Sequence, residues 1–188
     1  MTKDQLKKIM PRLPEEKIDL YFPYLFEAMQ MYEINTVLRE AAFLAQIAHE
    51  SVELRYMEEI ASGGTYEGRT DLGNTQPGDG KRYKGRGPIQ LTGRRNYKKF
   101  GDLMRVDLVN HPEKAVLPEY CFKIAGLYWK LRKLNVLADA GRFREITRRI
   151  NGGLNGLEDR MKYYALAKQV LTQCSPKGIN SPQAAVKS

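Results

Sequence analysis

The chain has 188 residues, of which 42% are hydrophobic and 28% charged, as in a soluble globular protein whose core needs no disulfide or metal support. Its two cysteines are too few for a disulfide framework, which favours a reducing compartment. The formal net charge of +9 favours association with anionic partners such as nucleic acid, a membrane surface or the bacterial envelope.

Helical signals dominate the first 51 residues. Thr2 can cap a short helix over residues 3–10, two prolines interrupt it, and a second helix is predicted from about Glu15. Residues 41–48 are apolar on more than one face of a helix. We therefore expect residues 34–51 to form a central helix that is buried on most sides.

Residues 61–88 are rich in glycine, proline, aspartate and asparagine and show neither a helical nor a strand period. This composition predicts an ordered loop region with at most a small hairpin. Loops of this length within a compact domain usually carry function.

Helical signals return after residue 112. Pro118 is expected to begin a helix, and its predicted apolar stripe consists of Ala125, Leu127, Tyr128, Leu131 and Leu134. Two more helices are predicted over residues 143–150 and 158–171. Because no segment resembles a linker between two domains, we expect one domain over residues 1–174 and a disordered tail over residues 175–188.

Acidic residues flank the end of the central helix. Glu50 closes it, where apolar neighbours desolvate the charged carboxylate and suit it to donating a proton near neutral pH. On a continuous helix Glu59 would point the opposite way, about 13 Å further along the axis, so the helix must end between the two. If the chain turns back near residues 54–57, a gap of roughly 6.5 to 9.5 Å would leave room for a water, as in inverting glycosidases. The alternatives are a solvent-facing or Arg-paired Glu50 and a solvated Glu58–Glu59 pair.

Residues 85–97 form a glycine-punctuated turn with several hydrogen-bonding side chains. Gly85 and Gly87 allow close approach of the backbone, while Gln90, Thr92 and Asn96 offer groups that can bind a water or an N-acetyl amide. The alternative is a turn that only caps its neighbours, with its arginines forming a solvated basic face: Arg86, Arg94 and Arg95.

Other chemistries have weaker support. His49–Glu50 is half of a zinc motif, but no second histidine follows at helical spacing, so we expect neither a metal nor an organic cofactor. There is no Gly-x-Ser-x-Gly run, and neither cysteine is next to a histidine. The basic stretch at residues 142–149 lacks the interleaved aromatics of a single-strand binder and is expected to be a solvated helix face.

Four segments together resemble glycoside hydrolase family 19, and within it the compact bacteriophage endolysins rather than the plant chitinases. They are residues 41–51, 55–59, 84–97 and 150–156, within a match of about residues 35–172. The resemblance implies a mainly α, lysozyme-like catalytic domain of two lobes, with long ordered loops and the site in the cleft between the lobes.

The resemblance also implies roles for single residues. Glu50 matches the family's general acid, Glu59 its general base, and Thr92 the hydroxyl that helps to hold the attacking water. The implied substrate-binding residues are His49, Gln90, Asn96, Asn151 and Arg160, the last of them beside the acid.

The chain departs from the plant pattern in three respects. The short spacing between the acids leaves Glu58 as an alternative to Glu59, and Asn155 stands where the plant enzymes have a third acid. The disulfides of the plant enzymes are absent as well.

The resulting expectation is an endolysin that hydrolyses β-1,4 glycosidic bonds of peptidoglycan by inversion, without a cofactor. Its partners would be peptidoglycan strands and the anionic envelope, with no nucleic acid and no stable membrane insertion. The alternatives are a chitinase, a lytic transglycosylase, and a non-catalytic module that binds the envelope or nucleic acid.

Access to the cell wall would need help. The N-terminal residues lack the apolar segment of a signal peptide, and no apolar run approaches the length of a membrane span. We expect the protein to be made in the host bacterial cytoplasm and to reach the wall in the periplasm after a separate membrane-pore protein, a holin, has permeabilised the membrane.

Overall fold

The computed structural model describes residues 1–173, and within them the regular secondary structure is helical, without strands. The α-helices are α1 (Lys3–Ile9), α2 (Glu15–Met31), α3 (Val37–Glu50), α4 (Asp79–Arg82), α5 (Arg94–Met104), α6 (Pro118–Leu131), α7 (Leu134–Asp139), α8 (Phe143–Asn151) and α9 (Leu157–Gln173). The 3-10 helices are η1 (Gly64–Tyr66), η2 (Thr70–Leu72) and η3 (Pro112–Val116). In place of the small hairpin that the sequence allowed, there are two isolated bridges, Glu58 to Arg86 and Arg86 to Leu91.

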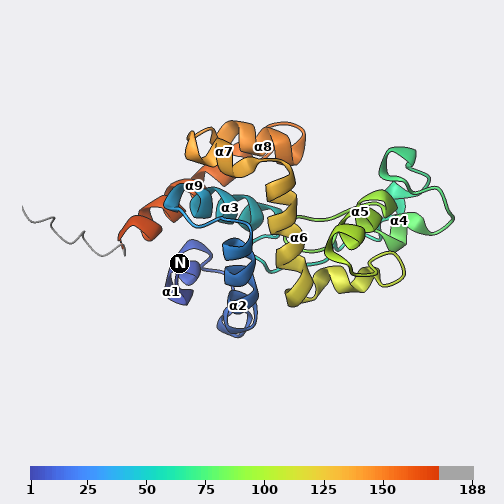
Figure 1. Cartoon of the computed structure of the whole chain (residues 1–188), viewed down its shortest axis with the longest axis horizontal. Helices are drawn as coiled ribbons and strands as arrows, with labels where there is room; N and C mark the ends of the chain where they lie inside the picture. Colours follow the sequence, from blue (N-terminus) through green and yellow to red (C-terminus); the bar gives the residue numbers. More distant parts are fainter. Residues whose placement is uncertain (174–188) are drawn as a thin grey trace, which may run out of the picture.

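The helices divide into two lobes (Figure 1). The helical lobe contains α1, α2, α3, α6, α7, α8 and α9, whereas the loop lobe contains η1, η2, α4 and α5. Extended segments join the loop lobe to the rest of the chain, and α6 lies on the side of the helical lobe that faces it. The mainly α, two-lobed architecture expected from the family resemblance is confirmed.

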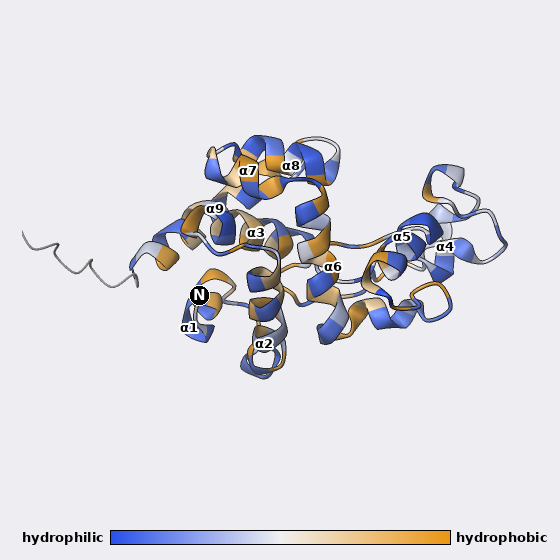
Figure 2. Ribbon diagram, viewed as in Figure 1, coloured by the Kyte–Doolittle hydropathy of each residue, from blue (hydrophilic) through white to orange (hydrophobic). Residues whose placement is uncertain are grey.

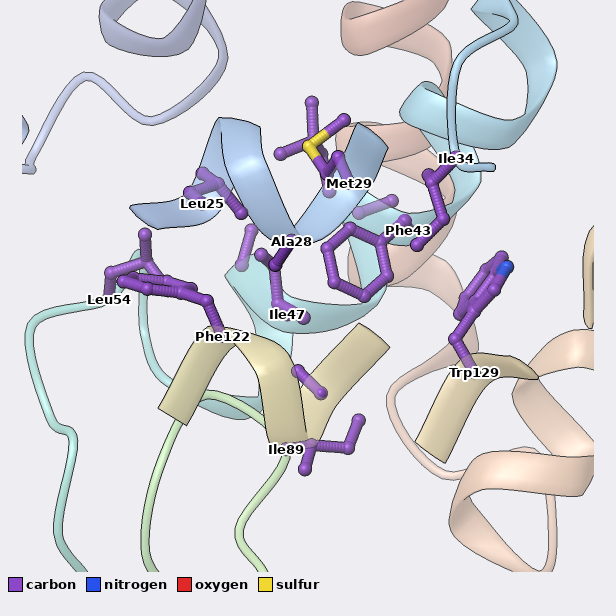
Figure 3. Close-up of a cluster of buried hydrophobic side chains, with 14 of the residues drawn as sticks. Leu25, Ala28, Met29, Ile34, Phe43, Ile47, Leu54, Ile89, Phe122 and Trp129 are labelled. Carbon is purple, nitrogen blue, oxygen red and sulfur yellow. The ribbon is translucent and has the colours of Figure 1, made fainter. Parts of the chain in front are cut away.

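The core of the helical lobe is built around α3, whose residues 40–48 are all buried. This helix packs against α9, while α2 packs against α6. In Figure 3, Phe43 and Ile47 of α3 meet side chains of α2 and α6, and the ring of Phe43 stands edge-on to that of Trp129 at a centroid distance of 5.3 Å. The prediction of a central helix buried on most sides is confirmed.

Several helix boundaries follow from local signals in the sequence. Thr2 caps α1 by accepting a hydrogen bond from the backbone N–H of Gln5 at 3.2 Å, and Pro118 occupies the first turn of α6. Gly152 ends α8 with a φ of 74°, a left-handed conformation that glycine adopts without strain. The predicted tail over residues 175–188 lies outside the described residues.

Helix α5 was not predicted. Its buried side is narrow, consisting of Tyr97, Phe100 and Gly101, and most of the other residues of the helix are charged or polar. Figure 2 shows this contrast, with α5 mostly hydrophilic and α3 mostly apolar. Gly93 precedes α5 and has no side chain to cap it, so the sequence contains no capping signal for the start of this helix.

The predicted apolar stripe of α6 is wrong in part. Leu131 is 43% exposed, and the buried residues of the helix are Cys121, Phe122, Ile124, Ala125, Gly126 and Trp129. The ring of Tyr32 packs so closely on Gly126 that a Cβ there would clash with it. The small residues Cys121, Ala125 and Gly126 form part of the buried side of α6, and a search for large apolar side chains overlooks them. Cys121 is a buried free thiol.

No helix in residues 1–173 combines the length and the apolar character needed to cross a bilayer.

Candidate active site

Glu50 ends α3 and faces a buried cation. Its Oε1 accepts a hydrogen bond of 2.5 Å from Nη2 of Arg160 on α9. The other terminal nitrogen of Arg160 donates to Gln46, which in turn donates to Thr147 at 2.9 Å. Arg160 is 2% exposed, and Gln46 and Thr147 are fully buried, whereas the side chain of Glu50 is 21% exposed. A continuous polar chain thus runs from the core to an acid at its surface.

The chain reverses directly after this acid through an unusual turn. Val52, Glu53 and Leu54 have φ values of 51°, 61° and 57°, a left-handed region that is costly for residues with side chains. Glu53 is buried, and its carboxylate accepts hydrogen bonds from the backbone N–H of Arg12 at 2.6 Å and from the hydroxyl of Tyr163 at 2.7 Å. These bonds anchor the turn that the two-acid arrangement requires.

Glu59 lies against the loop that begins at Gly85. Its backbone N–H donates to the Gly85 carbonyl at 2.9 Å, and its Oε2 accepts from the Gly85 N–H at 3.0 Å. The hydroxyl of Tyr66 donates to Oε1 at 3.1 Å. A Cβ at Gly85 would lie 2.5 Å from Oε1 of Gln90 and 3.2 Å from Oε2 of Glu59. A side chain at residue 85 would therefore displace the amide of Gln90 and crowd the carboxylate of Glu59.

Glu58 has a different environment, although it is adjacent in sequence. Its carboxylate is 44% exposed and forms ion pairs with Arg86 at 3.0 Å and Lys84 at 3.3 Å. Arg86 is itself buried, and Arg94 pairs with the buried Asp79 at 2.6 Å. The alternative interpretation of these two arginines as a solvated basic face is therefore wrong.

A cleft of about 310 Å³ collects most of the predicted site residues. Its lining contains Glu50, Gln90, Thr92, Asn96 and Asn151 from that set. Leu72, Ile89, Leu91, Lys99, Phe100, Tyr128, Arg132 and Ile150 complete it. We call this space the candidate cleft. It draws side chains from both lobes, as the resemblance implied.

Hydrogen bonds hold the polar side chains of the loop lobe in place within the candidate cleft. Gln90 has a left-handed φ of 52°, and its side-chain amide donates to the carbonyl of Gly87 at 3.0 Å. Thr92 donates its hydroxyl hydrogen to the carbonyl of Gln90 at 2.9 Å, and Asn96 donates to the carbonyl of Thr92 at 2.8 Å. A strained residue other than glycine at a cleft wall is typical of a functional site.

Three predicted site residues do not line the candidate cleft. Arg160 lies behind Glu50, and Glu59 adjoins the cleft through Gln90. His49 contacts Asp159, with 2.6 Å between Nδ1 and the carboxylate, and its ring fills the space that a side chain at Gly156 would need. These contacts explain the position of His49 by packing, so its role in substrate binding remains a prediction.

Two tyrosines of the site were missed by the sequence reasoning. Tyr66 lies in a segment without helical or strand period, so nothing marked it as a partner of Glu59. Tyr128 was assigned to an apolar stripe, yet it lines the candidate cleft and donates its hydroxyl to the carbonyl of Ile150 at 3.2 Å. The pKa of Tyr128 is raised, chiefly by burial and also by the charge of Glu50, against the opposing effect of Arg132, so this hydroxyl keeps its proton at neutral pH.

Within residues 1–173, no three His, Cys, Asp or Glu side chains gather in a way that could hold a metal ion.

The sequence matches the family model for glycoside hydrolase family 19, described as Chitinase class I, over residues 32–136. A glycosyl hydrolase family 19 domain-containing protein of Haemophilus influenzae is 38% identical over 106 residues, covering 56% of this chain and 51% of that protein. An endochitinase of Arabidopsis thaliana is 38% identical over 146 residues, covering 73% of this chain and 50% of the endochitinase. The chain thus spans about half the length of these curated relatives.

Solved structures match over a larger share of the chain. Chitinase C from Streptomyces griseus superposes with a TM-score of 0.75 and 25% identity, covering 91% of this chain and 76% of that one. A bacterial family 19 chitinase superposes with a TM-score of 0.75 and 25% identity, covering 95% of this chain and 97% of that one.

Proposed function

Because this chain belongs to glycoside hydrolase family 19 and is a glycoside hydrolase, we propose that it acts as an endolysin. It hydrolyses β-1,4 glycosidic bonds of bacterial peptidoglycan by inversion. The observation that carries the chemistry is the candidate cleft, which Glu50 lines together with Gln90, Thr92 and Asn96 while Glu59 adjoins Gln90. The net charge of +9 favours a substrate in the anionic envelope.

In this mechanism Glu50 is the general acid. It transfers its proton to the glycosidic oxygen as the bond from that oxygen to the anomeric carbon breaks. Arg160, at 2.5 Å, then stabilises the carboxylate that remains. The polar chain through Gln46 and Thr147 holds this cation in the required orientation.

Glu59 is the general base. It takes a proton from a water whose oxygen attacks the anomeric carbon from the face opposite the leaving group, so the product has the inverted configuration. Tyr66 and the N–H of Gly85 orient the carboxylate of Glu59. Thr92 donates its own hydrogen to the carbonyl of Gln90, which leaves its oxygen free to accept a hydrogen bond from the water.

The test is a parallel digestion of purified peptidoglycan and chitin, with the new sugar ends identified by mass spectrometry and their anomeric configuration by NMR. The proposal predicts peptidoglycan fragments with ordinary reducing ends of inverted configuration. Anhydro-sugar ends would indicate a lytic transglycosylase, which needs one acid and no activated water. Binding without cleavage would indicate a non-catalytic envelope module.

A chitinase is the second candidate, because the similar proteins and structures are named as chitinases. It would use the same acid, base and water. If the protein cleaves chitin oligomers and leaves peptidoglycan intact, the result would identify it as a chitinase.

We further propose that the enzyme, made in the host cytoplasm, reaches the wall only after a separate holin has opened the membrane. This step follows from the endolysin role, since peptidoglycan lies outside the cytoplasmic membrane. Expressed alone in bacteria, the protein should accumulate without lysis until chloroform permeabilises the cells, and Glu50→Gln should then prevent lysis. Lysis of the parent strain without any membrane lesion would contradict this route.

A further inference from the structure

The candidate cleft carries an excess of positive charge. Three of its lining residues are charged, namely Glu50, Lys99 and Arg132, and the carboxylate of Glu59 adjoins the cleft beside Gln90. Arg160 neutralises Glu50 at 2.5 Å, whereas within residues 1–173 neither Lys99 nor Arg132 forms an ion pair with a carboxylate. The two cations are thus available to a ligand in the cleft.

Arg132 is held in place by its own neighbours. It follows the last residue of α6, and its guanidinium lies over the ring of Tyr128, with 3.5 Å from its carbon to the ring centroid. The hydroxyl of Tyr128 donates a hydrogen bond to the carbonyl of Ile150, which restrains the ring. A guanidinium stacked on a ring can still present N–H groups to a carboxylate and bind it with two hydrogen bonds. Arg149 donates to the carbonyl of Arg132 at 3.0 Å, which brings another cation close to this end of the cleft.

Lys99 contributes from the other lobe. It lies on α5, one turn after Asn96, so both side chains project from the same side of the helix toward the candidate cleft. Its neighbour Lys98 is outside the cleft lining and pairs with Asp102 at 2.8 Å. Lys99 is exposed and can move to meet a charged group on a bound chain.

We propose that Lys99 and Arg132 bind carboxylates of the substrate and make the cleft selective for an anionic glycan over a neutral one. This inference rests on the proposed function and specifies what the site recognises. Chitin is a polymer of one neutral sugar, whereas peptidoglycan carries peptides with free carboxylates on every second sugar. A neutral glycan leaves both cations unpaired, while an anionic one gains charge-assisted hydrogen bonds.

The test compares two forms of one substrate. Purified peptidoglycan is used either with its native carboxylates or after carbodiimide coupling to methylamine, which converts them to neutral amides. We expect the parent enzyme to hydrolyse the native form about three- to tenfold faster than the amidated form. Arg132→Gln should reduce this preference, and the double variant Lys99→Gln/Arg132→Gln should abolish it.

Two matched controls remove a charge outside the candidate cleft. Lys98→Gln changes the neighbour of Lys99 on α5, and Lys130→Gln changes an exposed residue in the last turn of α6. Both should keep the parent's preference for the native form. Circular dichroism and melting curves establish that all four variants are folded, as expected for changes at side chains on the surface.

The outcomes separate the two proposals. Equal rates of the parent on native and amidated peptidoglycan, or a full preference retained in the double variant, would overturn the selectivity proposal and leave the endolysin function standing. Hydrolysis of chitin oligomers with no action on either form of peptidoglycan would overturn both.

Discussion

Arg160 of α9 donates a hydrogen bond of 2.5 Å to Glu50 of α3, which places a cation of 2% exposure directly behind the candidate acid. The two residues are 110 positions apart in sequence. The charge environment of the acid therefore depends on the packing of α3 against α9 and not on its neighbours along the chain.

Glu50→Gln should lower turnover by a factor of order 10² or more, because an amide has no proton to give to the leaving group. The amide oxygen can still accept from Arg160, so the variant should fold, but the buried cation loses its counter-charge and the free energy of unfolding should fall by about 1–3 kcal/mol. Hydrolysis rates and chemical denaturation measure the two effects. Glu158→Gln, at an exposed glutamate of α9, is the control. Activity of Glu50→Gln within a few-fold of the parent would remove Glu50 from the acid role.

Glu59→Gln should be far more damaging than Glu58→Gln, again by a factor of order 10². Glu59 is oriented by Tyr66 and Gly85 next to Gln90, whereas Glu58 forms an ion pair with the buried Arg86. Because Glu58→Gln weakens the pair with the buried Arg86, its main effect should be a loss of stability of about 1–3 kcal/mol and not a loss of turnover. Hydrolysis rates of both variants on the same peptidoglycan decide the matter. An inactive Glu58 variant beside an active Glu59 variant would reverse the assignment of the base.

Much of the helical lobe was predictable because its signals are local. Thr2 as a cap, Pro118 in a first turn and Gly152 after a last turn each act within a few residues of the helix end that they define. Helix α5 was not predicted, because its few buried residues lie within a run of charges and its start has no capping side chain.

In the candidate site, too, the features with local signals were predictable and the contacts between distant segments were not. The turn with Gln90, Thr92 and Asn96 was recognisable because closely spaced polar residues and glycines reveal it. The contacts of Tyr66 with Glu59, and of His49 with Asp159, join segments whose approach depends on the whole fold. No spacing or period in one sequence encodes such contacts.

Val52→Gly should stabilise the protein by about 0.5–1 kcal/mol. Valine at a φ of 51° is strained by about 1–2 kcal/mol, which exceeds the extra entropy that glycine gives the unfolded chain. The residue is 37% exposed, so little packing is lost. Denaturation with urea measures the change. Glu53→Gln, which weakens the anchor to Arg12 and Tyr163, should act in the opposite direction, and destabilisation by both changes would refute the argument from strain.

Asp79→Asn should change how the free energy of unfolding depends on pH. The guanidinium of Arg94 and the backbone N–H of Gln76 lower the pKa of Asp79 below its ordinary value of 3.8. Below about pH 4 the unfolded chain therefore binds more protons at this site than the folded protein does. The stabilisation is complete above this pH and is lost as the pH falls through the folded-state pKa.

For Asp79→Asn we expect a loss of about 2–4 kcal/mol at neutral pH, because the change breaks a largely buried pair with Arg94. Melting temperatures between pH 7 and 2 should then fall less steeply below pH 4 than those of the parent. Asp19→Asn, which alters an exposed pair with Lys3, should keep the parent's slope. Parallel curves for the parent and Asp79→Asn would show that this carboxylate is not the source of the acid sensitivity.

Gly85 limits how the enzyme can be redesigned. A Cβ there would displace the side-chain amide of Gln90 and crowd the carboxylate of Glu59, so a side chain at this position should disturb the cleft wall and the base together. A library that seeks new substrate preferences can instead diversify residues 99 and 132, which line the cleft and form no ion pair within residues 1–173. The residues that set substrate preference and the residues that hold the catalytic geometry thus lie in different parts of the same cleft. The first set can be varied while the second is kept.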